Sequence, residues 1–129
     1  MSMSRLFVEL NAPLNNSMWS WGAVRESDRT IFLRVWQEGY KKIDNSRCVW
    51  VCDTDGSNQT LGGNERRRQV ELIKDGYRAF MIMCKSEDGN CEKVIDFDQE
   101  QLFVGGKLIE VDGQMYLEYL GRIDVREAR

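Results

Sequence analysis

The stretch Thr30-Ile-Phe-Leu-Arg-Val-Trp36 carries the pattern that decides the class of fold. Ile31, Leu33 and Val35 fall on one face of an extended chain, because successive side chains in a strand point to opposite faces. The positions between them hold two aromatic residues with an arginine between them. The stretch therefore predicts a β-strand with one aliphatic face and one face of aromatic and cationic side chains.

The residues on either side predict a hairpin. Trp19 to Arg25 has the composition of a partner strand, and the polar link Glu26-Ser-Asp-Arg29 has the length of a hairpin loop. A second hairpin is expected between Lys107 and Leu120, where Asp112-Gly113 favours a type I′ turn. Shorter apolar runs predict further strands over Arg5–Leu10, Lys42–Cys52, Tyr77–Cys84 and Lys93–Phe97. The charged end, Asp124 to Arg129, is expected to fray.

One main helix is predicted after the polar loop that spans residues 53–63. Asn64 is a suitable N-cap, and Gly76 is a suitable residue just beyond the helix end. Val70, Leu72 and Ile73 supply the apolar face. The expected fold is α+β: a mostly antiparallel, barrel-like sheet with one main helix, in a single domain over residues 1–129.

Composition excludes several classes of function. The chain has 129 residues, is 42% hydrophobic and 30% charged, and contains no histidine. Without histidine there is no Ser-His-Asp or Cys-His nucleophile system, no His-ligated zinc and no histidine general base. The acid pairs Asp53 with Asp55 and Asp96 with Asp98 are interpreted as solvated loop residues. We expect a binding module that is not an enzyme and needs no cofactor.

Four cysteines and the absence of a long apolar segment bear on the compartment and on metals. No stretch approaches the about 20 apolar residues that a membrane span needs, and the N-terminus lacks the apolar core of a secretory signal. We expect a cytoplasmic protein with reduced thiols and no membrane contact. A zinc site built from the cysteines is the minor alternative, and its ligands would be Cys48, Cys52, Cys84 and Cys91.

Aromatic and cationic residues gather in the first hairpin. Trp19 and Trp21 share a face at a spacing of two, and Arg34 and Trp36 share a face of the partner strand. Rings and a guanidinium placed together can hold a flat aromatic ligand by stacking. Tryptophans in a small β domain also serve as core residues, and for the cluster as a whole both interpretations stay open.

A second basic group follows two glycines, in Gly62-Gly63-Asn64-Glu65-Arg66-Arg67-Arg68. Three arginines in a first helical turn oppose the helix dipole unless an anion binds there. Phosphate binding is one interpretation. The other is a solvated face with an ion pair between Arg67 and Glu71. The segment is not a P-loop, because no Lys-Ser or Lys-Thr follows the glycines.

The order of these elements resembles the PUA-like superfamily, which includes the EVE, ASCH and YTH-type base readers. The resemblance is carried by Trp19-Ser-Trp-Gly-Ala23, by residues 30–36 and by Val70-Glu-Leu-Ile-Lys-Asp-Gly-Tyr-Arg78. In addition, Leu102-Phe-Val-Gly-Gly-Lys-Leu108 looks like part of a module fused to bacterial HNH nucleases. The resemblance implies a pseudo-barrel that binds a base, plain or modified, in an aromatic pocket. In a defence or restriction system such a module supplies specificity and leaves cleavage to a nuclease.

If the resemblance holds, it assigns roles to seven residues. The bases would stack on Trp19, Trp21 and Trp36. The phosphates of DNA or RNA would meet Arg34, Arg66, Arg67 and Arg68. The alternative partner is a protein, recognised through the same aromatic and arginine residues by an interaction module or a small phage or plasmid regulator.

Overall fold

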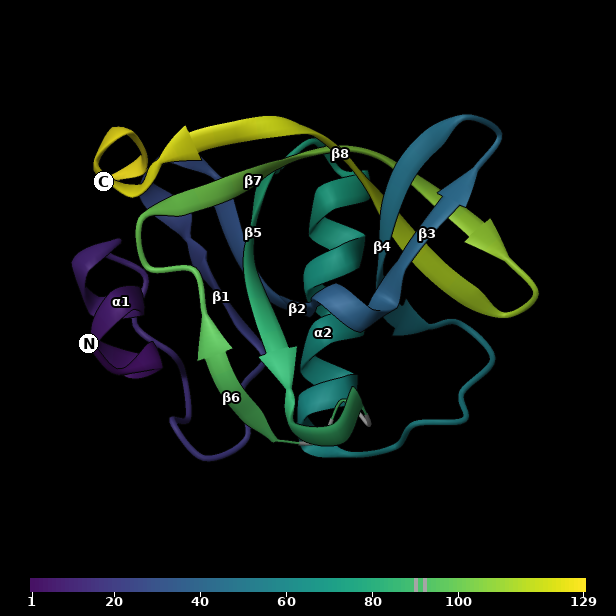
Figure 1. The fold of residues 1–129 in the computed structure, drawn as a ribbon, viewed down its shortest axis with the longest axis horizontal. Helices are drawn as coiled ribbons and strands as arrows, with labels where there is room; N and C mark the ends of the chain where they lie inside the picture. Colours follow the sequence, from purple (N-terminus) through teal and green to yellow (C-terminus); the bar gives the residue numbers. More distant parts are fainter. Residues whose placement is uncertain (90, 92) are drawn as a thin grey trace.

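The computed structural model describes residues 1–89, 91 and 93–129. These form one twisted sheet with two α-helices, α1 (Met3–Glu9) and α2 (Leu61–Lys74), on opposite sides of its centre (Figure 1). The strands run in the order β1-β2-β5-β7-β8-β4-β3, and β6 pairs with β5 off this path. Their bounds are β1 Gly22–Arg25, β2 Thr30–Trp36, β3 Tyr40–Ile43, β4 Ser46–Asp53, β5 Arg78–Ser86, β6 Val94–Phe97, β7 Gln101–Val111 and β8 Gln114–Asp124.

The most buried part of the sheet is the parallel pair of β2 and β5, in which Thr30 lies opposite Arg78 and Trp36 opposite Cys84. The other paired strands are antiparallel, as expected. A parallel pair is usually covered on both faces, so its strands are apolar on both. This explains why both faces of β2 between Ile31 and Trp36 are apolar except at Arg34.

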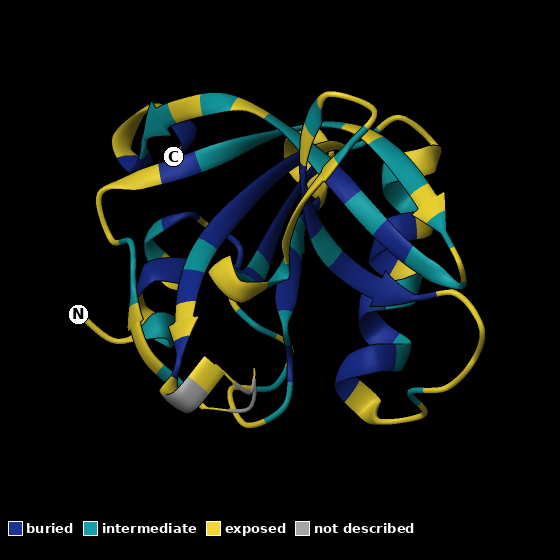
Figure 2. Cartoon of the chain, turned by 45° about the vertical axis from the view of Figure 1, so that its right-hand side comes forward, coloured by how far each residue is buried: buried dark blue, intermediate teal, exposed yellow. Residues whose placement is uncertain are grey.

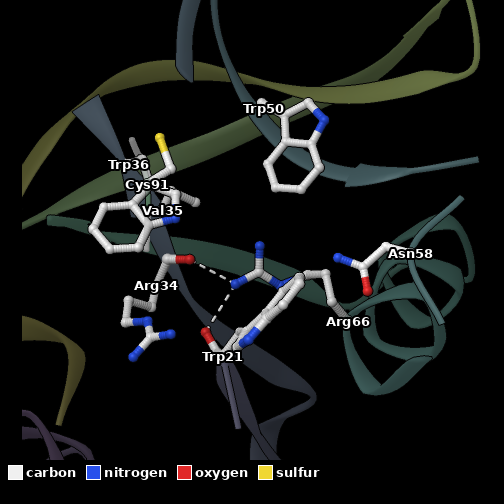
Figure 3. Close-up of a pocket in the computed structure, with 8 residues that line it drawn as sticks. All are labelled: Trp21, Arg34, Val35, Trp36, Trp50, Asn58, Arg66 and Cys91. Atoms are coloured by element: carbon white, nitrogen blue, oxygen red, sulfur yellow. Dashed lines mark hydrogen bonds between the residues drawn. The ribbon is translucent and has the colours of Figure 1, made fainter. Parts of the chain in front are cut away.

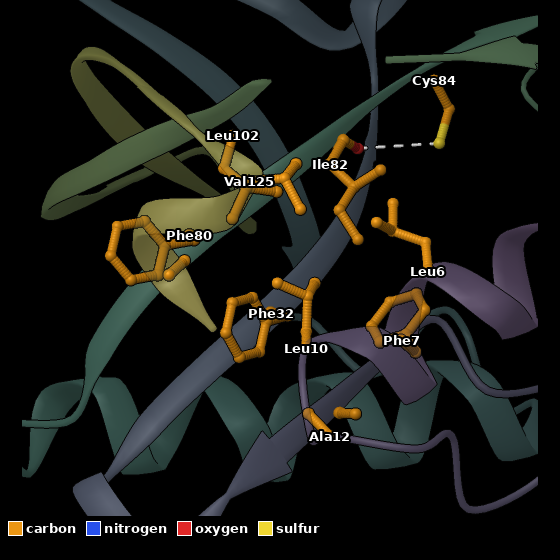
Figure 4. Packing of buried hydrophobic residues seen from close by; sticks show 12 residues of the cluster. Leu6, Phe7, Leu10, Ala12, Phe32, Phe80, Ile82, Cys84, Leu102 and Val125 are labelled. Carbon is orange, nitrogen blue, oxygen red and sulfur yellow. Dashed lines mark hydrogen bonds between the residues drawn. The ribbon is translucent and has the colours of Figure 1, made fainter. Parts of the chain in front are cut away.

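One face of the central pair packs against the N-terminal helix and the C-terminal turn. Leu6 and Phe7 of α1 lie against Phe32 of β2, together with Ile82 of β5 and Val125 (Figure 4). The sequence predicted a strand over Arg5–Leu10, and that prediction is wrong. Ser2 caps a helix there by accepting a hydrogen bond from the Arg5 backbone N–H, at 3.1 Å.

The opposite face packs against α2. Ile31, Leu33 and Val35 of β2 share this second cluster with Val70 of α2 and Met81 of β5. Buried residues run along the central strands and along the side of α2 that meets the sheet (Figure 2). The aliphatic face predicted for residues 30–36 is therefore confirmed as a core face, and the helix that covers it is α2.

The bounds of two other elements differ from those expected. The N-cap of α2 is Thr60, whose hydroxyl accepts a hydrogen bond from Gly63 N–H at 3.1 Å, and Asn64 lies inside the helix. Arg66 to Arg68 consequently sit in the second turn, beyond the reach of the terminal N–H groups. The C-terminal residues Val125 to Ala128 form a 3₁₀ turn with two buried side chains, so they do not fray as predicted.

The hairpin of β7 and β8 confirms the turn prediction. Asp112 and Gly113 have φ of 50° and 78°, the left-handed values that a type I′ turn requires. In contrast, the barrel-like expectation is not confirmed, because the sheet does not close: β1 and β3 are its two ends. β4 does not pair with the β1–β2 hairpin, and the gap between them, the seam, is filled by side chains.

Candidate functional site

A pocket of about 430 Å³ opens at the unclosed seam of the sheet (Figure 3). The first hairpin, β4, the loop before α2 and α2 itself all contribute to its wall. The indole rings of Trp21, Trp36 and Trp50 lie around the guanidinium of Arg66 (Figure 3). The remaining lining residues are Arg34, Val35, Asn58 and Cys91.

Arg66 joins the two sides of the seam. Its Nη1 donates to the carbonyl of Val51 in β4 at 2.8 Å. Its Nη2 donates to the carbonyls of Trp21 at 2.8 Å and of Arg34 in β2 at 2.6 Å. Strands that do not pair with each other are thus connected through one side chain of α2. The hydrogen bonds that strand pairing would have made are replaced by those of a guanidinium.

The charge of Arg66 has no carboxylate partner among the described residues. The side chain is only 1% exposed, and its buried Nε has no hydrogen-bond partner. Burial lowers the pKa of Arg66 to about 10, so the group remains a cation at neutral pH. A buried cation that is held only by neutral carbonyls leaves the pocket with a positive potential.

Trp21 is placed by close packing of α2 against the loop that precedes β1. A Cβ on Gly62 would come within 2.7 Å of the Trp19 carbonyl and would collide with the Trp21 indole, so only glycine fits. Glu65 fixes the same loop: its Oε2 accepts from Asn15 Nδ2 at 3.1 Å and from Ser20 Oγ at 3.2 Å. The Arg66 guanidinium then lies 5.6 Å from the Trp21 ring centroid.

Trp36 and Trp50 come from the two sides of the seam. Trp36 ends β2, and the guanidinium of Arg34 lies 5.9 Å from its ring centroid. Burial lowers the pKa of Arg34 as well, because the charged form is the one that water stabilises. Trp50 in β4 donates from Nε1 to Gln114 Oε1 at 2.6 Å, which fixes the orientation of its ring.

Asn58 enters the pocket from the loop before α2. Its Oδ1 accepts from both the Thr60 backbone N–H at 3.0 Å and the Thr60 hydroxyl at 2.6 Å. Since a backbone N–H can only donate, these bonds identify the oxygen of the amide. The Nδ2 group is therefore the end that Asn58 turns toward the pocket (Figure 3).

Of the seven residues singled out in the sequence, the structure brings four together in this pocket: Trp21, Arg34, Trp36 and Arg66. Trp19 does not line this pocket, and neither it nor Trp21 lies in β1, which begins at Gly22. Arg66 was expected to meet phosphate. Instead it is buried and committed to main-chain carbonyls.

Arg67 and Arg68 lie beside a second hollow, which shares no lining residue with the tryptophan pocket. Arg67 pairs with Asp53 at 2.8 Å and contacts Asn64, so the expected pair with Glu71 is absent, and Glu71 pairs with Lys74. Asp53 is correspondingly buried at 3% exposure. It is not the solvated loop acid that the sequence suggested. Arg68 is exposed.

Two pocket residues were missed in the sequence. Trp50 stands between Val49 and Val51, and alternation alone would have put it on the face opposite two core residues. Asn58 lies in an irregular loop, where no periodicity indicates the direction of a side chain. Strand alternation could therefore have identified Trp50 from the sequence, whereas no local pattern could have identified Asn58.

The cysteines do not form a metal site among the described residues, where no group of three or more potential ligands is gathered. The sequence placed Cys48 and Cys52 on one strand face, but a register shift between Trp50 and Cys52 separates them. Cys52 joins the core beneath α2, and Cys48 does not. Burial raises the pKa of Cys52 to about 11 and that of Cys84 to about 12.

Neither helix in the described part of the chain is long and apolar enough to cross a membrane. Comparison with known proteins gives no matching family model, no matching curated protein and no matching solved structure. The features that bear on function are therefore the geometry and the chemistry of the pocket.

Proposed function

We propose that the protein is a non-catalytic nucleic-acid-binding module that holds a single base, plain or modified, in the pocket of Trp21, Trp36 and Trp50. The observation that carries the proposal is three indole rings around a buried cation in a volume of about 430 Å³. This volume lies within the range of small-molecule sites and suits one flat ring system. Indole faces stack on bases, and a base turned out of its strand can enter such a pocket.

The charge of the pocket argues against another ligand that tryptophans commonly hold. Aromatic cages bind quaternary or methylated ammonium groups through the negative faces of their rings. Here two cations, Arg34 and Arg66, share the wall, and none of its described lining residues is acidic. An ammonium ligand would be repelled, whereas a neutral base next to a phosphodiester would be attracted.

Phosphates would meet the cations at the rim of the pocket. Arg34 is partly exposed there, beside Trp36, and Arg68 offers a further exposed cation on α2, beside the second hollow. The net charge of −3 means that such attraction is local, and affinity should depend on the few cations near the pocket. In a defence or restriction system this module would provide base specificity to a separate cleaving partner.

The test is binding to short single- and double-stranded DNA and RNA, with plain and modified bases, followed by anisotropy and tryptophan quenching. We expect binding that weakens as salt rises, with quenching of the pocket indoles. Trp36→Ala and Trp50→Ala should each weaken binding by about tenfold or more, since stacking of a base contributes about 1–3 kcal/mol. Trp19→Ala is the matched control, because Trp19 lies outside this pocket.

Absence of binding to every oligonucleotide at low salt would overturn the proposal and favour a protein partner. Equal loss of binding in Trp19→Ala and Trp36→Ala, with both variants folded, would also count against the pocket. Melting temperatures of all variants separate a loss of contact from a loss of fold.

A further inference from the structure

The polar atoms that the pocket offers to a ligand are hydrogen-bond donors. Asn58 presents its Nδ2 group, because its Oδ1 is held by Thr60. The Nη1 group of Arg66 donates one hydrogen to the Val51 carbonyl and has a second to offer. The guanidinium of Arg34 makes no hydrogen bond to the described residues and keeps its donors free.

The two main-chain carbonyls of the pocket wall that contact Arg66 are already engaged. The Trp21 carbonyl accepts from the Arg34 backbone N–H at 2.8 Å and from Arg66 Nη2 at 2.8 Å, which uses both of its lone pairs. The Arg34 carbonyl accepts from Arg66 Nη2 at 2.6 Å. No carboxylate lines the described wall, and the thiol of Cys91 is only a weak acceptor.

From this donor set we infer that the pocket selects a 6-oxopurine base, guanine or hypoxanthine, and reads its O6 and N7 edge. Guanine presents two adjacent acceptors there, and arginine paired with them is the commonest base-specific contact in DNA recognition. Adenine and cytosine present an amino group on the corresponding edge. A donor facing a donor leaves both groups unpaired in a buried site, which costs more than a missing contact.

This inference rests on the proposed function, and it adds the identity of the base. Thymine and uracil offer one acceptor, O4, on the same edge, so they should bind between guanine and the amino bases. The selectivity follows from Asn58 and the two arginines, whereas the affinity that all bases share follows from the indoles.

The experiment uses single-stranded probes in which one base is flanked by abasic residues, so that only that base can enter the pocket. Tryptophan quenching measures the dissociation constant for guanine, hypoxanthine, adenine, cytosine and 7-deazaguanine. We expect guanine and hypoxanthine to bind at least about tenfold tighter than adenine, as one bidentate contact provides. Adenine shares N7, so the preference over adenine comes from O6, and replacing N7 in 7-deazaguanine should weaken guanine binding by about the value of one hydrogen bond while leaving ring stacking unchanged.

A variant reverses the chemistry of the pocket. Asn58→Asp preserves the oxygen that Thr60 holds and replaces the Nδ2 donor by an acceptor. We expect the preference for guanine over adenine to shrink or reverse. Asn45→Asp is the matched control: it adds the same charge at an exposed turn residue with φ of 68°, away from the pocket lining, and should leave the preference intact.

The outcomes separate the two proposals. Binding of all five probes with equal affinity would overturn the inference while supporting a base reader. A guanine preference that is unchanged in folded Asn58→Asp would also overturn it. If no probe binds, the proposed function fails with it. Should Asn58→Asp fail to fold, the comparison of guanine and hypoxanthine with adenine in the unmodified protein still decides the question.

Discussion

At the scale of single residues, Arg66 performs two tasks that are usually separate. It supplies the hydrogen bonds that the open seam of the sheet lacks, and it gives the pocket its charge. A buried guanidinium is expensive to desolvate, and its lowered pKa reflects that cost.

Replacement of Arg66 is expected to destabilise the fold. Arg66→Met has similar length but leaves the carbonyls of Val51, Trp21 and Arg34 with fewer donors in a buried setting, at an expected cost of about 2–4 kcal/mol. Urea unfolding measures the free energy of unfolding. Arg68→Ala, on the exposed side of the same helix, is the control and should change it by less than about 0.5 kcal/mol. Equal effects of the two variants would contradict the bridging role.

The cysteines make a second prediction at this scale. Cys48, Cys52 and Cys84 are buried, and Cys91 is the exposed thiol at the pocket wall. Burial raises the pKa of all four thiols, and Cys91 is the exposed one, so alkylation of the native protein should modify Cys91 first. Mass spectrometry after iodoacetamide treatment should show one rapid adduct, and all four after denaturation. A bound base should slow the rapid reaction. Rapid native labelling of Cys52 would contradict the structure.

At the scale of elements, the local sequence predicted the turn between β7 and β8 correctly and the first helix wrongly. Asp112-Gly113 forms the expected turn between β7 and β8, because its positive φ values suit few other residues. Arg5–Leu10 has the apolar composition of a strand, but Ser2 caps a helix there, and Leu6, Phe7 and Leu10 are buried against the sheet. Tertiary packing overrode β-propensity there.

Gly113→Ala tests the hairpin. The residue has φ of 78°, and an added Cβ would lie 3.0 Å from Asp55 Oδ2. We expect a loss of about 1 kcal/mol in the free energy of unfolding, since an L-residue is strained at this φ. Gly121→Ala in β8 is the matched control, because its Cβ would meet no atom within 4 Å and its φ is not positive. A loss for Gly121→Ala as large as that for Gly113→Ala would exclude backbone strain as the cause.

At the scale of the whole molecule, Arg25 ties together segments that are far apart in the sequence. Its Nη1 donates to the carbonyls of Leu10 at 2.6 Å and Ala128 at 2.7 Å, and its Nη2 pairs with Asp28 at 2.7 Å. The N-terminal helix, the first hairpin and the C-terminal turn thus meet at one side chain.

Arg25→Met should therefore lower the free energy of unfolding by about 2–4 kcal/mol, because two buried carbonyls lose their donor. Arg126→Ala, an exposed residue that pairs only with Asp124 nearby, should have little effect. Chemical denaturation compares them. Hydrogen exchange adds a readout: in Arg25→Met the amides of α1 and of the C-terminal turn should lose protection together.

The same cluster makes stability depend on acid. Hydrogen bonding to Arg25 holds the pKa of Asp28 at about 2, against an ordinary value of 3.8. The unfolded chain then takes up the proton before the folded chain does, so this contribution is complete above pH 3.8 and is lost as the pH falls toward 2. Melting temperatures between pH 5 and pH 2 should fall less steeply for Asp28→Asn than for the unmodified protein. Parallel curves would show that Asp28 contributes nothing to this dependence.

The sequence by itself determined the features that depend on neighbouring residues. These are the α+β class, the alternating strand at residues 30–36, the turn at Asp112-Gly113 and the stretch around Trp21, Arg34 and Trp36 as a candidate site. Strand periodicity and positive φ are local properties, and they can be recognised in a short window of residues.

Only the tertiary structure decided how these pieces meet. It placed Trp50 and Asn58 in the same pocket as Trp21, and it buried Arg66 where exposure was expected. These outcomes depend on β4 approaching β2 without pairing to it, and on the helix side chain that fills the seam. Such contacts join residues that are distant in the sequence, and no local pattern specifies them.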